Sequence, residues 1–353
     1  TFKKLPIMVP RIKEKIKKYN FMSVRDSMKK DDLLKNPEWC KDTPQRIALG
    51  AIYDCCKAYK TCFGQKKNGL ITNFNISYKT KKDKSQCLYL EQQNFSKKNG
   101  SLFTRISSFG KLKGIYNKKL KLKDLKIDHD CRLVKKEDKY YLFLPTDYKE
   151  NTEPLPIGTI GLDSGIRTFQ TGYSPDGLVV EIGKDCSKTL SPLLEKTDIL
   201  RSVASTSNKR KKDKLFSRIK RINLKIKNKV DDLHWKTIKF LTSNYDTIVV
   251  SDFKTSSLLK NKKLNKRSKR VLCLLEHFSF KNRLTYKCEQ NGNRVFFVDE
   301  SYTSKTCSNC GWLNHNLGAN KTFECEKCKV VIDRDVNAAK NILLKNWNIY
   351  SSA

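Results

Sequence analysis

Acidic residues are scarce in this sequence. Its 353 residues include 36 Asp and Glu against 73 Lys and Arg, which gives a formal net charge of +37. Such an excess is unusual for an ordinary enzyme and indicates a partner that is long and densely negative. Nucleic acid fits best, because each phosphate that is neutralised releases counterions. An anionic membrane surface is the alternative.

Long apolar runs are missing as well. No segment is long enough to span a bilayer, and the first residues carry no apolar core of a signal peptide. The predicted partners therefore exclude a membrane, and they include no small-molecule substrate. A disulfide framework is not indicated either, because the number of cysteines, 13, is odd and the chain is long. These features are typical of a reducing compartment.

The first half of the chain divides into two predicted segments. Residues 1–64 read as helical, since Ile47, Ala51, Cys55 and Tyr59 recur every four residues. Residues 65–156 read as a small basic β domain, with short strands over 70–78, 87–90 and 140–144.

The pattern changes at residue 157. Strands are predicted over 159–162, 167–173 and 178–182, followed by one long helix to about 243 and a strand over 247–250. A basic loop over 254–270, a helix over 271–291, a strand over 294–298 and a helix over 335–348 complete the order. Three strands, then helix, strand, helix, strand and helix is the order of the α/β ribonuclease-H-like fold, with a mixed central sheet.

Two cysteine pairs carry the most specific motif. Cys307 and Cys310 form one Cys-x-x-Cys knuckle, and Cys325 and Cys328 form a second after fourteen intervening residues. Each knuckle can direct two thiolates at one tetrahedral ion. Four thiolates leave no open position, so we predict a structural Zn²⁺ and a zinc ribbon at 303–332, inserted in the fold.

Acidic residues follow the predicted strands. Asp163 ends the first of them, before a glycine turn, and Asp335 opens the last helix, where it is also a candidate N-cap. Phosphodiester cleavage with two cations needs three or four carboxylates at one place. We therefore predict a two-ion Mg²⁺ site. The alternative for Asp163 is an ordinary turn aspartate, and the alternative for Asp335 is a helix cap without a metal-binding role.

The third carboxylate is displaced from its expected strand. The strand over 247–250 exits at Ser251-Asp252, whereas the strand over 294–298 exits at Asp299-Glu300. Neighbouring strands lie about 4.8 Å apart, so Glu300 could reach the metal position left vacant by Ser251. Asp252, shifted by one residue, is expected on the opposite face of the sheet.

These segments together resemble a known family. Residues 161–167 (GLDSGIR), 302–311 (YTSKTCSNCG) and 333–339 (DRDVNAA) look like the RuvC and zinc-ribbon motifs of TnpB-type transposon nucleases. The N-terminal part, with Thr43-Pro44 and residues 79–83 (KTKKD), is similar in character and order. TnpB proteins usually have Glu-Asp where this chain has Ser251-Asp252. The relocated glutamate resembles the arrangement in Fanzor, the eukaryotic and viral branch.

The resemblance implies an RNA-guided DNA endonuclease. A guide RNA of the omega type would select a double-stranded DNA target next to a short motif. The nuclease would span 157–302 and 333–353 around the ribbon, with Asp163, Glu300 and Asp335 catalytic. Residues 1–64 would form a recognition segment and 65–156 a small β-barrel-like wedge domain. Lys82 and Gln86 have the spacing of the residues that contact the motif in that family.

Two other functions remain open at this point. Ser251 is compatible with a catalytically inactive transposon relic that binds nucleic acid through its ribbon. A strand-transfer transposase of the same fold is the other alternative, although nothing in the sequence indicates joining. The basic stretch 260–270 resembles a nuclear-import signal, so a nuclear location is predicted. We expect a monomer.

Overall fold

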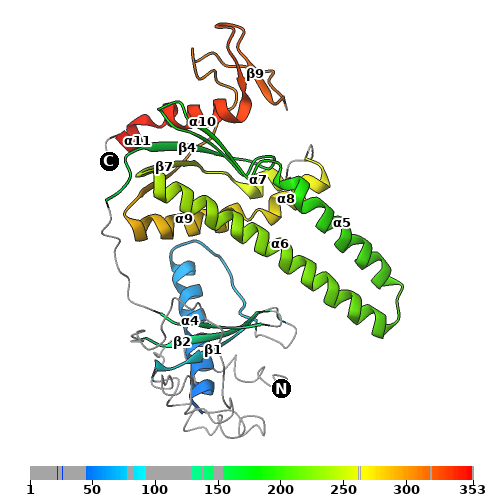
Figure 1. Cartoon of the computed structure of the whole chain (residues 1–353). Coiled ribbons are helices and arrows are strands. Elements are labelled where there is room, and N and C mark those ends of the chain that lie inside the picture. The colour runs from blue at the N-terminus through cyan, green and yellow to red at the C-terminus, as the bar shows by residue number, and fades with distance from the viewer. Residues whose placement is uncertain are drawn as a thin grey trace. The chain divides into compact units, whose positions relative to one another are not determined.

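The computed structural model describes residues 22, 26, 45–77, 83, 85–92, 129–136, 139–145 and 154–351, except 261, 263 and 319. The chain divides into two compact units, Thr1–Tyr148 and Lys149–Ala353. Each unit is described by itself (Figure 1). No helix among the described residues is long and apolar enough to cross a membrane.

The first unit is built around one helix and one sheet. Helix α4 (Gln45–Lys67) buries Ile52, Cys56 and Tyr59, whose spacing puts them on one face. Strands β1 (Ser85–Leu90), β2 (Cys131–Lys136) and β3 (Lys139–Phe143) pair antiparallel in sequence order. The strands predicted near 87–90 and 140–144 are therefore confirmed.

The strand predicted over 70–78 is wrong for its described part. Residues 70–77 form no strand. Phe74 and Ile76 instead pack against the buried face of α4, and the Phe74 ring meets that of Phe63 edge-on at 5.0 Å. Their apolar character serves a helix–loop contact here, without a ladder of backbone hydrogen bonds.

The second unit holds a five-stranded mixed sheet. Its strands are β4 (Thr159–Ser164), β5 (Gln170–Tyr173), β6 (Val179–Ile182), β7 (Thr247–Ser251) and β8 (Arg294–Val298), in the order β6-β5-β4-β7-β8. β7 is parallel to both β4 and β8, whereas β5 is antiparallel to β4 and β6. Every residue of β7 is buried, as expected for a β-branched run in the middle of a sheet. The five strands predicted after residue 157 are confirmed.

Helices cover one face of this sheet from 186 to 291. The long helix predicted after the third strand is two helices, α5 (Cys186–Ser205) and α6 (Lys209–Asn244), which run side by side as a hairpin (Figure 1). The helical pattern is interrupted there because the side chain of Asn208 caps α6. It accepts a hydrogen bond from the Lys211 amide at 3.0 Å. The predicted loop over 254–270 is also wrong, since it contains α7 (Thr255–Lys260) and the start of α8 (Lys266–Leu274). Helix α9 (His277–Asn291) follows.

The opposite face of the sheet carries helix α10 (Arg334–Lys345) and the short α11 (Trp347–Ser351). The two faces have separate cores. Ile248 and Val250 of β7 pack with α6 and α9, whereas Val249 packs with Ile342 and Leu343 of α10. This alternation assigns each residue of the central strands to one face. The small strands β9 (Thr322–Glu324) and β10 (Val331–Asp333) form an antiparallel hairpin that leads into α10.

Candidate active site and metal centre

The ends of β7 and β8 both place side chains on the face of the sheet that α10 covers. Val249 and Val298 both pack against this helix, so residues two positions further along lie on the same side. These residues are Ser251, at the end of β7, and Glu300, just after β8. Ser251 is directly opposite Val298 in the parallel register of the two strands. The α10 face therefore brings the exits of β7 and β8 together.

Gly161 seats α10 directly on β4. A Cβ atom at this position would lie 2.6 Å from Cγ of Leu343 and 2.7 Å from the carbonyl oxygen of Ala339. Only glycine permits this approach of helix and strand. Asp163 lies two residues further along β4 on the same face, and Asp335 lies in the first turn of α10. The close packing at Gly161 thus draws the two aspartates toward one another.

The three predicted carboxylates interact electrostatically. Asp163, Glu300 and Asp335 are each half-buried. Burial raises the pKa of Asp163 well above its usual value, and the negative charges of Asp335 and Glu300 raise it further. Burial also raises the pKa of Glu300 and of Asp335. The raised pKa values mean that the ionised forms of these acids are destabilised in the folded chain. A bound cation would stabilise the ionised forms.

The carboxylate of Glu300 reaches the end of β7. Ser251 forms a side-chain hydrogen bond with it, which partly offsets the rise in its pKa caused by burial. Oγ of Ser251 also accepts a hydrogen bond from the amide of Ser164 at 3.2 Å, one residue after Asp163. Ser251 therefore links Glu300 to β4, and the glutamate lies beside the position that a residue 251 carboxylate would occupy.

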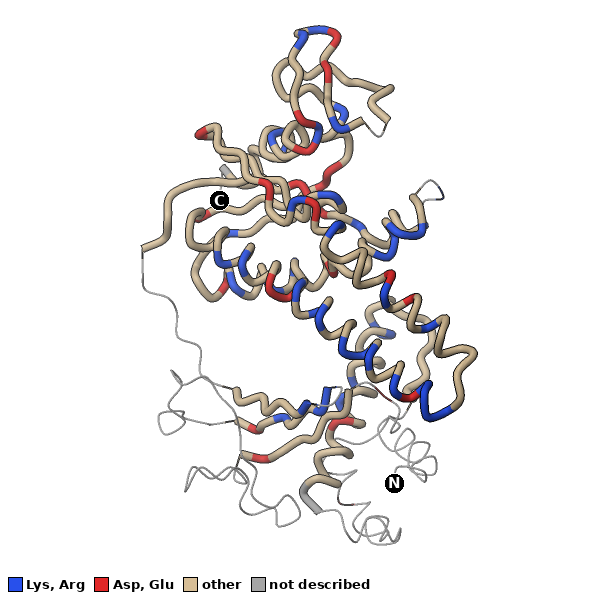
Figure 2. The backbone as a smooth tube through the Cα atoms, turned by 45° about the vertical axis from the view of Figure 1, so that its right-hand side comes forward, with Lys and Arg blue, Asp and Glu red and all other residues tan. Residues whose placement is uncertain are grey.

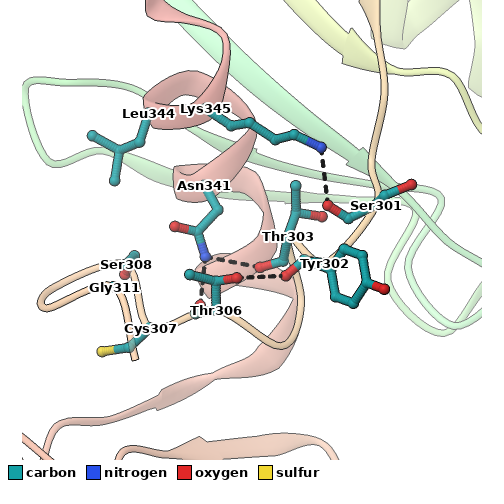
Figure 3. A pocket seen from close by; sticks show the side chains of 10 residues that line it. All are labelled: Ser301, Tyr302, Thr303, Thr306, Cys307, Ser308, Gly311, Asn341, Leu344 and Lys345. Carbon is teal, nitrogen blue, oxygen red and sulfur yellow. Dashed lines mark hydrogen bonds between the residues drawn. The ribbon is translucent and has the colours of Figure 1, made fainter. Parts of the chain in front are cut away.

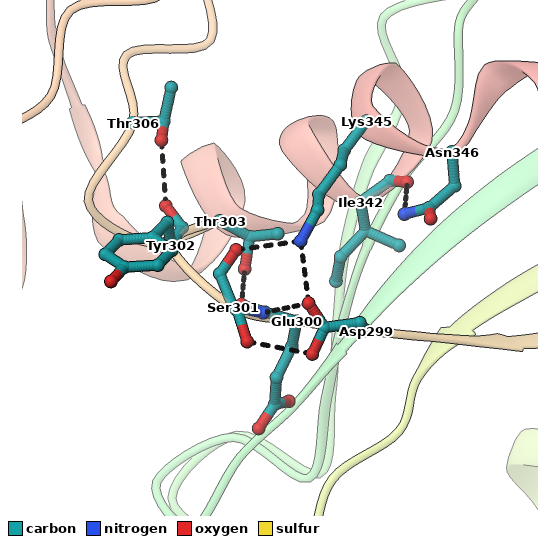
Figure 4. A network of polar contacts seen from close by, with 9 residues as sticks. All are labelled: Asp299, Glu300, Ser301, Tyr302, Thr303, Thr306, Ile342, Lys345 and Asn346. Atoms are coloured by element: carbon teal, nitrogen blue, oxygen red, sulfur yellow. Dashed lines mark hydrogen bonds and ion pairs between the residues drawn. The ribbon is translucent and has the colours of Figure 1, made fainter.

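The neighbouring acids Asp252 and Asp299 are held elsewhere. Asp252 is ion-paired with Lys281 of α9, on the opposite face of the sheet, as the pleating predicts. Asp299 is exposed and accepts hydrogen bonds from Lys345 and Ser301, each at 2.8 Å. Figure 4 shows the Glu300 carboxylate pointing away from this exposed network. Of these three acids, only Glu300 is directed at Ser251.

The N-cap of α10 is Asp333, and the capping role considered for Asp335 is wrong. Oδ1 of Asp333 accepts hydrogen bonds from the amides of Asp335 at 2.9 Å and Val336 at 3.3 Å. Asp333 ends β10 in an extended conformation suited to a cap, whereas Asp335 is already inside the helix. The side chain of Asp335 is therefore not used as the cap.

The four cysteines converge as the spacing predicts. Cys307, Cys310, Cys325 and Cys328 place all four sulfur atoms within 4.8 Å of one another, the one such group of three or more possible ligands among the described residues. The sulfur atoms of Cys307 and Cys328 are 3.6 Å apart, and those of Cys310 and Cys325 are 3.5 Å apart. Four sulfurs bound to one zinc at about 2.3 Å would be about 3.8 Å apart. The cluster can therefore hold a zinc-sized ion after a small expansion.

The two knuckles share one backbone design. The amide of Gly311 donates to the Cys307 carbonyl at 2.9 Å, and the amide of Lys329 donates to the Cys325 carbonyl at 2.9 Å. Both donors have positive φ, 76° at Gly311 and 61° at Lys329. Hydrogen bonds from Asn309 and from the backbone of Val330 lower the pKa of the Cys328 thiol to about 6, which favours a metal-binding thiolate.

Two asparagines tie the first knuckle to α10. Asn337, fully buried, donates to the carbonyl of Thr306 at 2.7 Å and accepts from the amide of Ser308 at 3.0 Å. Asn341, one turn later, donates to the carbonyls of Thr303 and Thr306 at 2.8 and 2.6 Å (Figure 3). The cysteine cluster is thereby fixed to the helix that carries Asp335.

Comparisons with known proteins agree on one family. A family model described as "Probable transposase" matches residues 135–262, and one described as "Cas12f1-like, TNB domain" matches residues 277–342. The chain is 31% identical to the "Putative transposase" of Paramecium bursaria Chlorella virus 1 over 87% of its own length and 70% of that protein's. The chain belongs to the TnpB-like transposase family. The resemblance stated from the sequence motifs is confirmed at that level.

Other TnpB-like relatives extend over most of the chain. A "TnpB-like protein" of Acanthamoeba polyphaga mimivirus is 33% identical over 93% of this chain, which spans 63% of that protein's length. The "Putative RNA-guided DNA endonuclease InsQ" of Escherichia coli is 26% identical over 87% of this chain and 75% of its own.

Two arginines of this TnpB-like chain received no role from the sequence. Arg334 lowers the pKa of Asp163 and of Asp335, and the exposed Arg167 lowers the pKa of Asp335. Arg334 stands between two aspartates in the sequence, which was the available signal. Both arginines supply positive charge close enough to act on the acidic cluster.

The predicted motif-reading pair is only partly visible. Lys82 lies outside the described residues. Gln86 is half-buried on β1, opposite Lys135 of β2. The spacing of the pair in the sequence stays a prediction.

Proposed function

We propose that this TnpB-like chain is an RNA-guided DNA endonuclease whose catalytic carboxylates are Asp163, Glu300 and Asp335. The observation that carries the proposal is the gathering of these acids from three separate elements on the α10 face of the sheet. Cleavage with two cations needs such acids together, and the charges of Glu300 and Asp335 both act on Asp163. The strand order is compatible with a RuvC-type ribonuclease H fold, and the position of Glu300 favours the Fanzor branch.

The donor set suits hard divalent cations such as Mg²⁺. All three candidate ligands are carboxylates, which Mg²⁺ prefers. Bound cations would acidify a water and neutralise the phosphodiester.

The cysteine cluster is proposed as a structural zinc site. Its four thiolates fill a tetrahedral shell, so zinc there would stabilise the ribbon and leave the chemistry to the carboxylates. Asn337 and Asn341 would transmit that stability to α10. Zinc would thus support the placement of Asp335 without touching the substrate.

A basic stretch of α6 is the proposed contact for the guide RNA and its duplex with target DNA. Between residues 209 and 229 there are eleven basic residues and one acidic residue. Figure 2 shows them along the helix. Nine of the eleven are exposed, and among the described residues the exposed ones make no ion pair. Unpaired, solvated cations of this density are suited to phosphates.

Several further assignments are part of the proposal. The helical segment 1–64 and the β domain 65–156 would hold the guide duplex and read the short DNA motif, with Lys82 and Gln86 as contacts. The basic stretch 260–270 would direct the protein to the nucleus. The chain would act as a monomer. A double-stranded DNA target follows from the nuclease proposal.

The decisive experiment starts from the RNA that copurifies with the protein. Sequencing this RNA identifies the guide, and a plasmid that carries the matching sequence beside a library of short motifs is then incubated with the complex and Mg²⁺. We expect cutting at the guided site that EDTA abolishes. Binding without cutting would support the relic, and joined products would support the strand-transfer enzyme.

A further inference from the structure

Tyr302 is an exposed aromatic residue two positions after Glu300. It is 64% exposed, and its φ of 66° lies in the left-handed region. Residues with a side chain seldom adopt this conformation, whereas glycine adopts it freely. Strain of this kind persists where the surrounding structure enforces it, often at functional sites. The position therefore retains a tyrosine where glycine would fit the backbone better.

The backbone on both sides of Tyr302 is fixed. Its carbonyl accepts hydrogen bonds from the amides of Lys305 and Thr306 and from Oγ1 of Thr306, each at 3.0 Å. Thr303 donates to the carbonyl of Glu300 through its amide at 3.2 Å and its hydroxyl at 2.8 Å. The turn is thus closed by its own hydrogen bonds, which leave the ring outside. A rigid turn that presents an aromatic ring to solvent is a ready-made stacking surface.

A pocket of about 450 Å³ borders the turn that carries Tyr302 (Figure 3). It lies between this turn, the first cysteine knuckle and α10, and its lining includes Tyr302, Thr306, Ser308, Asn341 and Lys345. No carboxylate is among the lining residues. The Tyr302 ring, the Ser308 hydroxyl and the amide oxygen of Asn341 can meet a planar, hydrogen-bonding ring, whereas the Lys345 ammonium is already paired with Asp299.

We propose that Tyr302 stacks on one nucleobase of the single DNA strand presented to Glu300, with the pocket receiving the edge of that base. The inference rests on the proposed function, because a strand entering at Glu300 is what brings a base to the ring. Stacking tolerates every base, since each has a π-face. This suits a nuclease whose sequence choice is made by base pairing with a guide. Tyr302 would be a positioning residue that orients the strand for cleavage.

The test uses the full zinc-loaded chain and a short single-stranded DNA. The probes share one sequence and carry the fluorescent base 2-aminopurine at successive positions. Ca²⁺ replaces Mg²⁺, so that binding is measured without cutting. We expect quenching at one or two adjacent positions with the wild type. Tyr302→Phe and Tyr302→Trp should retain it, whereas Tyr302→Leu and Tyr302→Gly should lose it and bind about 5- to 100-fold more weakly.

Two variants separate stacking from folding. Tyr302→Gly relieves the backbone strain, so its thermal unfolding should be no worse than that of the wild type. Tyr286→Ala removes a ring that is 56% exposed on α9 and should leave quenching unchanged. Equal quenching by the wild type and Tyr302→Gly, or no quenching at any position, would overturn the proposal. A wild type that quenches the probe but cuts no DNA would overturn the nuclease and leave the stacking site supported.

Discussion

Ser251, at the end of β7, hydrogen-bonds to the carboxylate of Glu300, which follows β8. The two residues come from neighbouring parallel strands, and both lie on the face that α10 covers. A glutamate on one strand thus reaches the site that the neighbouring strand would have served. This contact gives the relocation of the acid a physical basis.

Replacement of one knuckle cysteine should release the metal. Cys325→Ser removes one of four converging sulfurs, so bound zinc should fall well below one equivalent per chain by elemental analysis. Thermal stability should fall with it, because zinc binding contributes folding energy to such small folds. Cys273→Ser is the matched control, since Cys273 is an exposed cysteine outside the cluster. A full equivalent of zinc in Cys325→Ser would show that the ligand set is wrong.

Gly161→Ala should displace α10. The added Cβ would meet a backbone oxygen and a buried leucine, each nearer than 3.0 Å. Overpacking of this kind costs about 1–3 kcal/mol of unfolding free energy, measured by urea denaturation. DNA cleavage should fall as well, since α10 carries Asp335. Gly64→Ala is the control, because a Cβ on this helical glycine meets nothing within 4 Å and should be neutral or stabilising. Equal effects of the two substitutions would contradict the role of Gly161.

Asn337→Ala should loosen the cysteine ribbon from α10. It leaves the partly buried carbonyl of Thr306 without one of its donors and the Ser308 amide without its acceptor, at a cost of about 1–3 kcal/mol in unfolding free energy. Protection of the Ser308 amide from hydrogen exchange should fall in parallel. Asn228→Ala, at an exposed position of α6, should change stability by no more than about 0.5 kcal/mol. Unchanged protection at Ser308 would show that Asn337 does not couple the two elements.

The contribution of two buried histidines to stability should decrease as pH falls below 6.5. Burial lowers the pKa of His234 and of His277 from 6.5 to about 4. Nε2 of His234 donates to the Leu275 carbonyl, and Nδ1 accepts from Arg283, so the ring is held neutral. The unfolded chain gains protons from pH 6.5 downward, while the folded chain resists until about pH 4. Each histidine should therefore cost about 2 kcal/mol of unfolding free energy by pH 5.

Denaturant titrations between pH 7.5 and pH 5 check this expectation. His277→Phe, which can keep the stacking on Phe169, should show a shallower loss than the wild type. His315→Gln, at an exposed position, should retain the wild-type slope. Parallel curves for the wild type and His277→Phe would rule out this source of pH dependence.

The sheet was predictable because each strand has a clear local sequence pattern. Runs such as 247–250 are short, β-branched and bounded by polar turns, and the knuckle spacing predicted the convergence of the four cysteines. The helix break at 205–209 was harder to see, since Thr206, Ser207 and Asn208 interrupt two helical patterns by only one turn. The short helices at 255–274 were missed because their many lysines and arginines obscure a few apolar contacts.

The candidate site could be predicted only in part, because several of its contacts depend on tertiary structure. Asp333 and Asp335 are both good capping residues by sequence, and only the tertiary placement of α10 decides between them. The contact of Ser251 with Glu300 depends on the lateral register of two strands whose paired residues, such as Ser251 and Val298, are far apart in the chain. Arg167 and Arg334 became relevant only after their electrostatic effect on the acids was visible.

Cleavage of a guided plasmid target in Mg²⁺ by Glu300→Gln and Asp252→Asn tests the central claim most directly. Glu300→Gln should retain binding of guide and target but lose most of its cleavage activity. The loss should exceed the roughly 10- to 100-fold that is typical when a residue that only orients a metal ligand is removed. Asp252→Asn should cut well, because its carboxylate is paired with Lys281 on the opposite face. Ser251→Glu combined with Glu300→Gln should regain part of the lost activity. Robust cutting by Glu300→Gln together with an inactive Asp252→Asn would contradict the account.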